Sequence, residues 1–135
     1  MIDLKRWKAF FLFAALFNAA AGMLMVFAPE LFGVLMQIEA ADIQASTAWI
    51  HQFGVLVLGF GLAYFWLSRD PLANRNLALL GCIGKLAVFA TGWIDYFAGH
   101  APLYFAILVV ADALFALVFY YFYRITATAE TRTFV

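Results

Sequence analysis

The sequence predicts an all-α fold, an integral membrane antiparallel four-helix bundle. Of the 135 residues, 67% are hydrophobic and 12% are charged, and the mean hydropathy is +0.95. A soluble domain is about half apolar and about a quarter charged, so water could not keep this chain dissolved. Four apolar segments each reach the length of about 20 residues that crosses a bilayer. They use most of the chain, which predicts a single transmembrane domain over residues 1–135.

The breaks between the apolar segments set the order of the elements. The first predicted span ends before Pro29, and the second ends before Ser68-Arg69-Asp70-Pro71. Pro102 opens the fourth span, because proline is tolerated in a first helical turn. The pattern disfavours strands, because each segment is about twice as long as a barrel strand and lacks two-residue alternation. The predicted spans cover residues 9–28, 46–67, 76–98 and 102–123.

The connection between the first two spans is the long one. Its apolar residues fall on one helical face, namely Leu31, Phe32, Leu35 and Met36. An amphipathic helix of this kind lies in the membrane interface. The pattern therefore predicts an interfacial helix over residues 30–37.

Basic residues predict the orientation of the spans. Seven of the eight fall on the side shared by the termini and the second loop: Lys5, Arg6, Lys8, Arg69, Arg75, Arg124 and Arg132. The opposite side carries the acidic residues Glu30, Glu39 and Asp42 instead. By the positive-inside rule, both termini are predicted to be cytoplasmic.

Polar residues inside the spans predict a buried centre. Lys85, the eighth basic residue, lies in the third span and Asp112 in the fourth, at depths that differ by about 3 Å. Asn18 in the first span reaches the same level. A lone charge there costs about 2.5–3.5 kcal/mol, so we expect a Lys85–Asp112 ion pair with Asn18 hydrogen-bonded nearby. Two interpretations stay open, a clamp that fixes helix register and a site for a ligand or proton.

A second set of polar residues is predicted toward the outer face: His51, Gln52, Asp95 and His100. Two histidines with carboxylates could bind zinc or copper, or ligate a haem iron. Because no pair has ligand spacing on one helix, we predict no cofactor, with His51 and His100 as the only metal or haem candidates. The alternative is a hydrogen-bonded His51 in the bundle mouth and an exposed His100 in its turn.

Glycines recur along the first two spans, with Gly22 in the first and Gly54, Gly59 and Gly61 in the second. Small residues let membrane helices approach closely, so we expect these positions to pack helix against helix. With zero net charge, the chain lacks the excess of basic residues that indicates nucleic-acid binding. The single cysteine, Cys82, excludes a disulfide framework.

Four stretches carry a family resemblance: Phe17-Asn18 through Pro29-Glu30-Leu31-Phe32, Gly54 through Gly61-Leu62-Ala63-Tyr64, Gly81 through Gly84-Lys85-Leu86, and Asp112-Ala113-Leu114-Phe115. Together they cover most of the chain, which resembles the small bacterial four-span proteins grouped with the DoxX-like families. The resemblance implies a bacterial inner-membrane bundle and no defined reaction. Size and span count also resemble the small multidrug-resistance transporters. Those carry a glutamate in the first helix, where this chain offers only Asn18.

The sequence favours a non-enzymatic binding or accessory subunit in the lipid bilayer, which presents helix faces to a membrane-protein partner or to copies of itself. The first alternative is a proton-coupled or small-solute transporter that works as a dimer, with Lys85, Asp112 and Asn18 as its midplane site. The second is a membrane enzyme acting on a lipid or quinone. In that case Lys85 and Asp112 would be acid–base groups, with His51 at the entrance.

Overall fold

The computed structural model describes residues 2–130, with side chains through residue 127. Every regular element in this part of the chain is a helix. In chain order the elements are α1 (Leu4–Phe27), α2 (Pro29–Met36), α3 (Ala40–Arg69), α4 (Arg75–Phe97), α5 (Leu103–Leu108) and α6 (Val110–Glu130). Four segments within them are long and apolar enough to cross a membrane: Leu4–Phe27, Ala40–Arg69, Arg75–Phe97 and Leu103–Ala127.

The helices extend beyond the predicted spans, because hydropathy detects only the apolar part of a helix. α1 begins at Leu4 rather than at residue 9, since the side chain of Asp3 accepts a hydrogen bond of 3.2 Å from the Arg6 N–H and caps the first turn. α3 likewise begins at Ala40 rather than at residue 46. The predicted short helix is present as α2, which ends at Gln37 in the left-handed conformation.

The fourth span differs from the prediction of one continuous helix over residues 102–123. α5 ends at Leu108, and α6 begins at Val110 after a turn at Val109. The N–H of Asp112 donates to the carbonyl of Val109 at 3.0 Å, a spacing of three residues instead of the four of an α-helix. Because Val109 is itself apolar, hydropathy carries no signal for this interruption.

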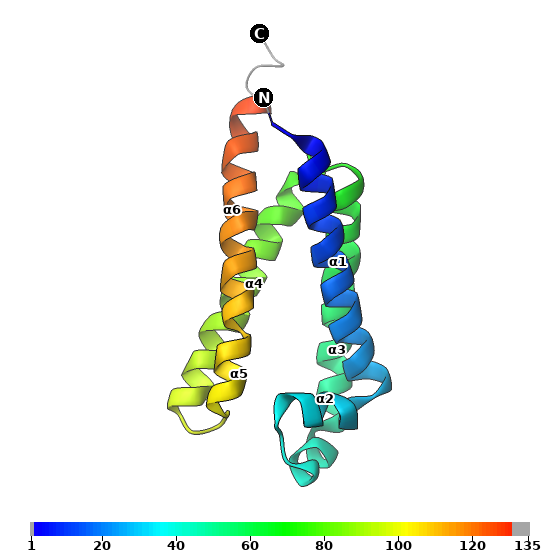
Figure 1. The fold of residues 1–135 in the computed structure, drawn as a ribbon, viewed down its shortest axis with the longest axis vertical. Coiled ribbons are helices and arrows are strands. Elements are labelled where there is room, and N and C mark those ends of the chain that lie inside the picture. The colour runs from blue at the N-terminus through cyan, green and yellow to red at the C-terminus, as the bar shows by residue number, and fades with distance from the viewer. Residues whose placement is uncertain (1, 131–135) are drawn as a thin grey trace.

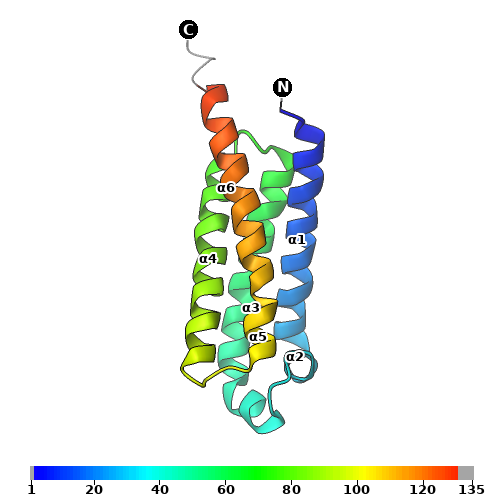
Figure 2. The same cartoon turned by 60° about the vertical axis from the view of Figure 1, so that its left-hand side comes forward.

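The chain forms two helical hairpins. α1 packs along α3, and α4 packs along α6, so we refer to the α1–α3 hairpin and the α4–α6 hairpin. The hairpins meet at the end that holds the start of α1, the end of α6 and the α3–α4 turn, and they separate toward the end that holds α2 and α5 (Figure 1). We refer to these as the termini end and the far end. Seen from the side, the four long helices run the length of the molecule (Figure 2).

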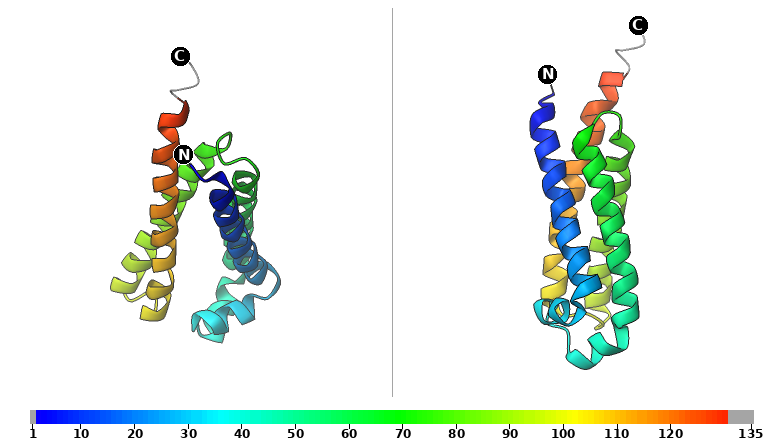
Figure 3. Two further views of the ribbon diagram at one scale, coloured as in Figure 1. Left: turned by 45° about the horizontal axis from the view of Figure 1, so that its top comes forward. Right: turned by 90° about the vertical axis from the view of Figure 1, so that its right-hand side faces the viewer.

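The left view of Figure 3 shows the same separation with the top brought forward. Six of the basic residues assigned to one side lie near the helix ends at the termini end: Lys5, Arg6, Lys8, Arg69, Arg75 and Arg124. Arg132 lies outside the described residues. Glu30, Glu39 and Asp42 belong to α2 and to the start of α3, at the far end. The two ends of the molecule therefore carry opposite charge.

Aromatic rings join the hairpins in the half of the molecule nearer the termini end. We refer to them as the aromatic cluster: Trp7, Phe10, Phe11, Phe60, Tyr64, Phe115, Phe119 and Phe122. Phe119 of α6 meets Phe11 of α1 with ring centroids 5.5 Å apart, and it meets Tyr64 of α3 at 4.8 Å. Both pairs are edge-to-face, the arrangement that aromatic quadrupoles favour. The cluster thus closes the bundle at this end.

Glycines bring α1 and α3 close together. A Cβ on Gly54 would lie 2.8 Å from Cβ of Met25, and a Cβ on Gly22 would lie 2.9 Å from the carbonyl oxygen of Gly54. A Cβ on Gly61 would lie 3.3 Å from the backbone nitrogen of Ala19. The predicted close packing is confirmed at these three positions. It is wrong for Gly59, where a Cβ would meet nothing within 4 Å.

Candidate functional site

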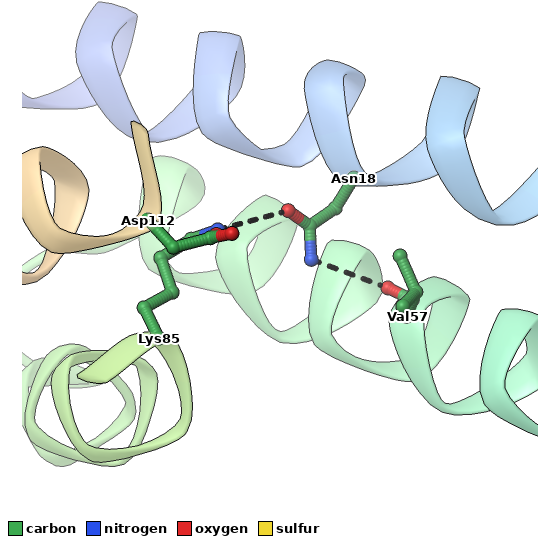
Figure 4. A network of polar contacts seen from close by, with 4 residues as sticks. All are labelled: Asn18, Val57, Lys85 and Asp112. Atoms are coloured by element: carbon green, nitrogen blue, oxygen red, sulfur yellow. Dashed lines mark hydrogen bonds and ion pairs between the residues drawn. The ribbon is translucent and has the colours of Figure 1, made fainter. Parts of the chain in front are cut away.

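The three polar residues predicted to form a buried centre meet near the middle of the molecule. We refer to Asn18, Lys85 and Asp112 as the polar centre. Nζ of Lys85 lies 2.5 Å from Oδ1 of Asp112 and 3.4 Å from Oδ1 of Asn18 (Figure 4). The predicted ion pair and the nearby Asn18 are therefore confirmed as geometry. Whether the centre is a ligand or proton site stays a prediction.

A backbone carbonyl completes the polar centre. Nδ2 of Asn18 donates to the carbonyl oxygen of Val57 at 3.4 Å (Figure 4). The resulting chain of contacts runs from α3 through α1 and α4 to α6, so each of the four long helices supplies one group. The sequence analysis missed Val57, because every residue carries a carbonyl. The available signal was Gly61 one turn later, whose missing side chain lets α3 approach the turn of Asn18.

Two aromatic rings contact the ammonium group. Nζ of Lys85 lies 4.8 Å from the ring centroid of Phe115 and 5.9 Å from that of Tyr64, within the range of cation–π attraction. Gly81, one turn before Lys85, leaves room for the ring of Tyr64, since a Cβ there would lie 2.7 Å from its Cε1. The sequence analysis placed no aromatic residue at the polar centre and so missed this contact. The aromatic cluster therefore borders the polar centre on its termini-end side.

The two charged partners are unequally buried. The side chain of Lys85 is 7% exposed, whereas that of Asp112 is 21% exposed. Two apolar side chains of the same region are also exposed. Leu108, four residues before Asp112, is 37% exposed, and Phe17 of α1, whose ring is tilted against that of Phe115 at a centroid distance of 5.6 Å, is 46% exposed. The ammonium is enclosed, while the side chain of Asp112 stays partly exposed.

The second set of polar residues does not join the polar centre in one site. His51 lies half-buried on α3, and Gln52 beside it is exposed. Asp95 is exposed on α4, and His100 is exposed in the loop after that helix. The two histidines therefore belong to different hairpins, with His51 on α3 and His100 after α4. Among the described residues, no group of three or more His, Cys, Asp and Glu side chains is placed to hold a metal ion.

Comparisons with protein-family models, with curated proteins and with solved structures give no match for this chain. The chemistry of the polar centre therefore follows from its own geometry. It is an electrically neutral set of groups with one enclosed donor, Lys85, and one partly exposed acceptor, Asp112.

Proposed function

We propose that this chain is a multi-pass protein of the bacterial inner membrane, with both termini in the cytoplasm, and that it acts there as a non-enzymatic binding subunit whose polar centre receives a ligand. The charge difference between the two ends of the molecule supports the orientation, because basic residues flank membrane spans on the cytoplasmic side. The four long apolar helices support the membrane location.

The unequal burial of Lys85 and Asp112 carries the binding proposal. A structural clamp is best served by enclosing both charges, because an ionised group at mid-membrane depth costs about 2.5–3.5 kcal/mol on insertion scales. Here only the ammonium is enclosed. A carboxylate that is fixed by its partner and still accessible is the arrangement expected of a group that binds a ligand.

The contacts of Lys85 favour binding over acid–base catalysis. Its ammonium group faces two oxygens and two aromatic rings, and its side chain is 7% exposed. A general acid has to come within hydrogen-bond distance of the substrate atom that it protonates. Because Lys85 is enclosed, a substrate atom cannot come within that distance of it. His51, the other predicted catalytic-site residue, lies elsewhere on α3.

One observation favours a transporter as the second candidate. The interruption at Val109 comes three residues before Asp112 in the chain. Transporters build their midplane sites from discontinuous helices of this kind. Four helices enclose little volume, so such a transporter would work as a dimer. Proton-dependent uptake by proteoliposomes, lost in Asp112→Asn, would support this candidate over the binding subunit.

The test of the binding proposal is to identify small molecules that stay with the protein. The wild type, a Lys85→Met/Asp112→Leu double variant and a Gly59→Ala control are purified in lipid nanodiscs and released for native mass spectrometry. We expect a bound molecule on the wild type and on Gly59→Ala, and a loss of at least about tenfold in occupancy for the double variant. Circular dichroism checks that the double variant remains helical. Equal occupancy in all three proteins, or no bound molecule in any, would contradict the proposal.

A further inference from the structure

We infer that the ligand of the polar centre is a neutral amphiphile with a hydroxyl group, which donates a hydrogen bond to Asp112 while its alkyl part lies against the neighbouring apolar side chains. This inference rests on the proposed binding function. It specifies the polarity, the charge and the depth of the group that Asp112 receives.

The polarity follows from which partner can be reached. An ammonium group has three N–H donors and no acceptor. Those of Lys85 lie among Oδ1 of Asp112, Oδ1 of Asn18 and the ring of Phe115, and the side chain is enclosed. An incoming ligand therefore meets the carboxylate. An ionised carboxylate only accepts hydrogen bonds and has about four acceptor positions, so the ligand group has to be a donor.

The charge follows from the neutrality of the centre. Lys85 and Asp112 cancel each other, since they form an ion pair at 2.5 Å. A cationic ligand would leave one uncompensated positive charge at mid-membrane depth, which is costly in a hydrocarbon medium. An anionic ligand would be repelled by the exposed carboxylate. A neutral hydroxyl donates its hydrogen and adds no charge.

The depth and the surroundings of Asp112 limit the rest of the ligand. Two apolar side chains of this region, Leu108 four residues before Asp112 and Phe17 against the Phe115 ring, are both more than one-third exposed. The hydrocarbon core of a bilayer is about 30 Å thick, so a group at mid-depth lies about 15 Å from either headgroup layer. The headgroup of an ordinary phospholipid does not reach that level. A small-headed lipid, such as a long-chain alcohol or a diacylglycerol, can place its hydroxyl there.

Photolabelling with competition tests this inference. The protein is placed in phosphatidylcholine nanodiscs with a hexadecanol derivative that carries a diazirine in its alkyl chain, and labelled peptides are mapped by mass spectrometry. We expect labelling beside Asp112, on the segments that contain Leu108 and Phe17. Unlabelled 1-hexadecanol should compete at least about tenfold better than hexadecyl methyl ether, which has the same chain and no donor. Hexadecylamine tests a cationic donor, and diacylglycerol distinguishes a glyceride from a free alcohol.

Variants link the selectivity to the polar centre. In Lys85→Met/Asp112→Leu, alcohol and ether should compete equally, because the acceptor is gone. In Gly59→Ala, a position with open space around it, the preference for alcohol should persist. Asp112→Asn is made as well, so that the result does not depend on one variant folding. It should weaken the preference for alcohol, since a neutral amide is a weaker acceptor than a carboxylate.

Each outcome decides between the possibilities. Equal competition by alcohol and ether in the wild type, or stronger competition by the amine, overturns the inference. If the wild type retains another molecule by native mass spectrometry but is not labelled beside Asp112, the inference fails while the binding proposal stands. If no molecule is retained and no labelling occurs, both fail, and water or lipid chains alone cover Asp112.

Discussion

The two hairpins hold their paired helices together by different kinds of contact. In the α1–α3 hairpin, Gly22, Gly54 and Gly61 let two backbones approach without any charged contact between them in the described contacts. In the α4–α6 hairpin, a lysine and an aspartate bridge the helices. Backbone packing produces a fixed interface that presents no polar side chain to a ligand. A charged bridge can hold helices together and also present a polar group, provided that it is not fully enclosed.

Asn18 connects the two arrangements. It belongs to the tightly packed hairpin, yet its side chain bonds to Lys85 of the other one. This contact links the hairpins near the middle of the molecule, and the aromatic cluster links them nearer the termini end. Substitutions in one hairpin at a time can therefore test whether close packing or the charged bridge stabilises it. Asn18, which contacts both hairpins, tests the link between them.

The largest effect should come from breaking the charged bridge on one side. We expect Lys85→Met to lower the free energy of unfolding by about 3–5 kcal/mol, because it leaves Asp112 as an uncompensated buried charge. Reversible unfolding in mixed detergent micelles measures this difference. Adding Asp112→Leu should restore most of the loss, since an apolar pair can replace a buried ion pair. A single variant as stable as the wild type would show that the bridge contributes no stability.

The next largest effect should come from filling the glycine interface. We expect Gly54→Ala to destabilise the protein by about 1–3 kcal/mol, because its Cβ would lie 2.8 Å from Cβ of Met25 on α1. Gly59→Ala is the matched control on the same helix, and its Cβ meets nothing within 4 Å. The same unfolding measurement compares the two variants. Equal effects at both positions would mean that close packing does not distinguish this hairpin.

A smaller effect should follow from removing the link between the hairpins. We expect Asn18→Leu to cost about 0.6–1.7 kcal/mol, the range of interhelical hydrogen bonds in membrane proteins. Both of its hydrogen bonds are 3.4 Å long, which favours the lower part of that range. Asn18→Asp separates charge from shape, because it keeps the size and adds a second carboxylate beside Lys85. If Asn18→Leu lowered the free energy of unfolding as much as Lys85→Met does, Asn18 would be as important to the ion pair as the two charged residues themselves.

The smallest effect should be at the termini end of the α4–α6 hairpin. There Nε of Arg75 donates to Oγ1 of Thr126 at 3.3 Å, and Nη2 donates to the carbonyl of Tyr123 at 3.0 Å. We expect Thr126→Val to cost about 0.5–1 kcal/mol, because the bond from Arg75 is lost together with the hydroxyl's own bonds to the carbonyls of Phe122 and Tyr123. Those two carbonyls stay within the helix, and Arg75 keeps its position over the Tyr123 ring at 4.2 Å. Thermal unfolding in detergent measures this small shift. A loss of unfolding free energy larger than that of Asn18→Leu would mean that the contacts of Arg75 stabilise this hairpin more than expected, relative to the Lys85–Asp112 bridge.

Hydropathy was sufficient to predict the four long helices, because apolar length is a property of the sequence itself. The bridge between Lys85 and Asp112 could be predicted as well, since a short loop makes their helices neighbours and residue counting gives their depths. The aromatic contacts on Lys85 could not, because Phe115 resembles many other phenylalanines in composition. The separation of the hairpins also escaped prediction, since it depends on side-chain fit between residues distant in the chain.

The turn at Val109 has an electrostatic consequence for the neighbouring acid. Because the helix starts again at Val110, Asp112 stands in the first turn of α6. The N–H groups at a helix start carry a partial positive charge of about half a unit, the positive pole of the helix macrodipole. The carboxylate is therefore stabilised from two directions, by an ammonium group on one neighbour and by peptide dipoles of its own helix. A straight, uninterrupted fourth span would have placed the same aspartate among mid-helix peptides, where no such pole exists.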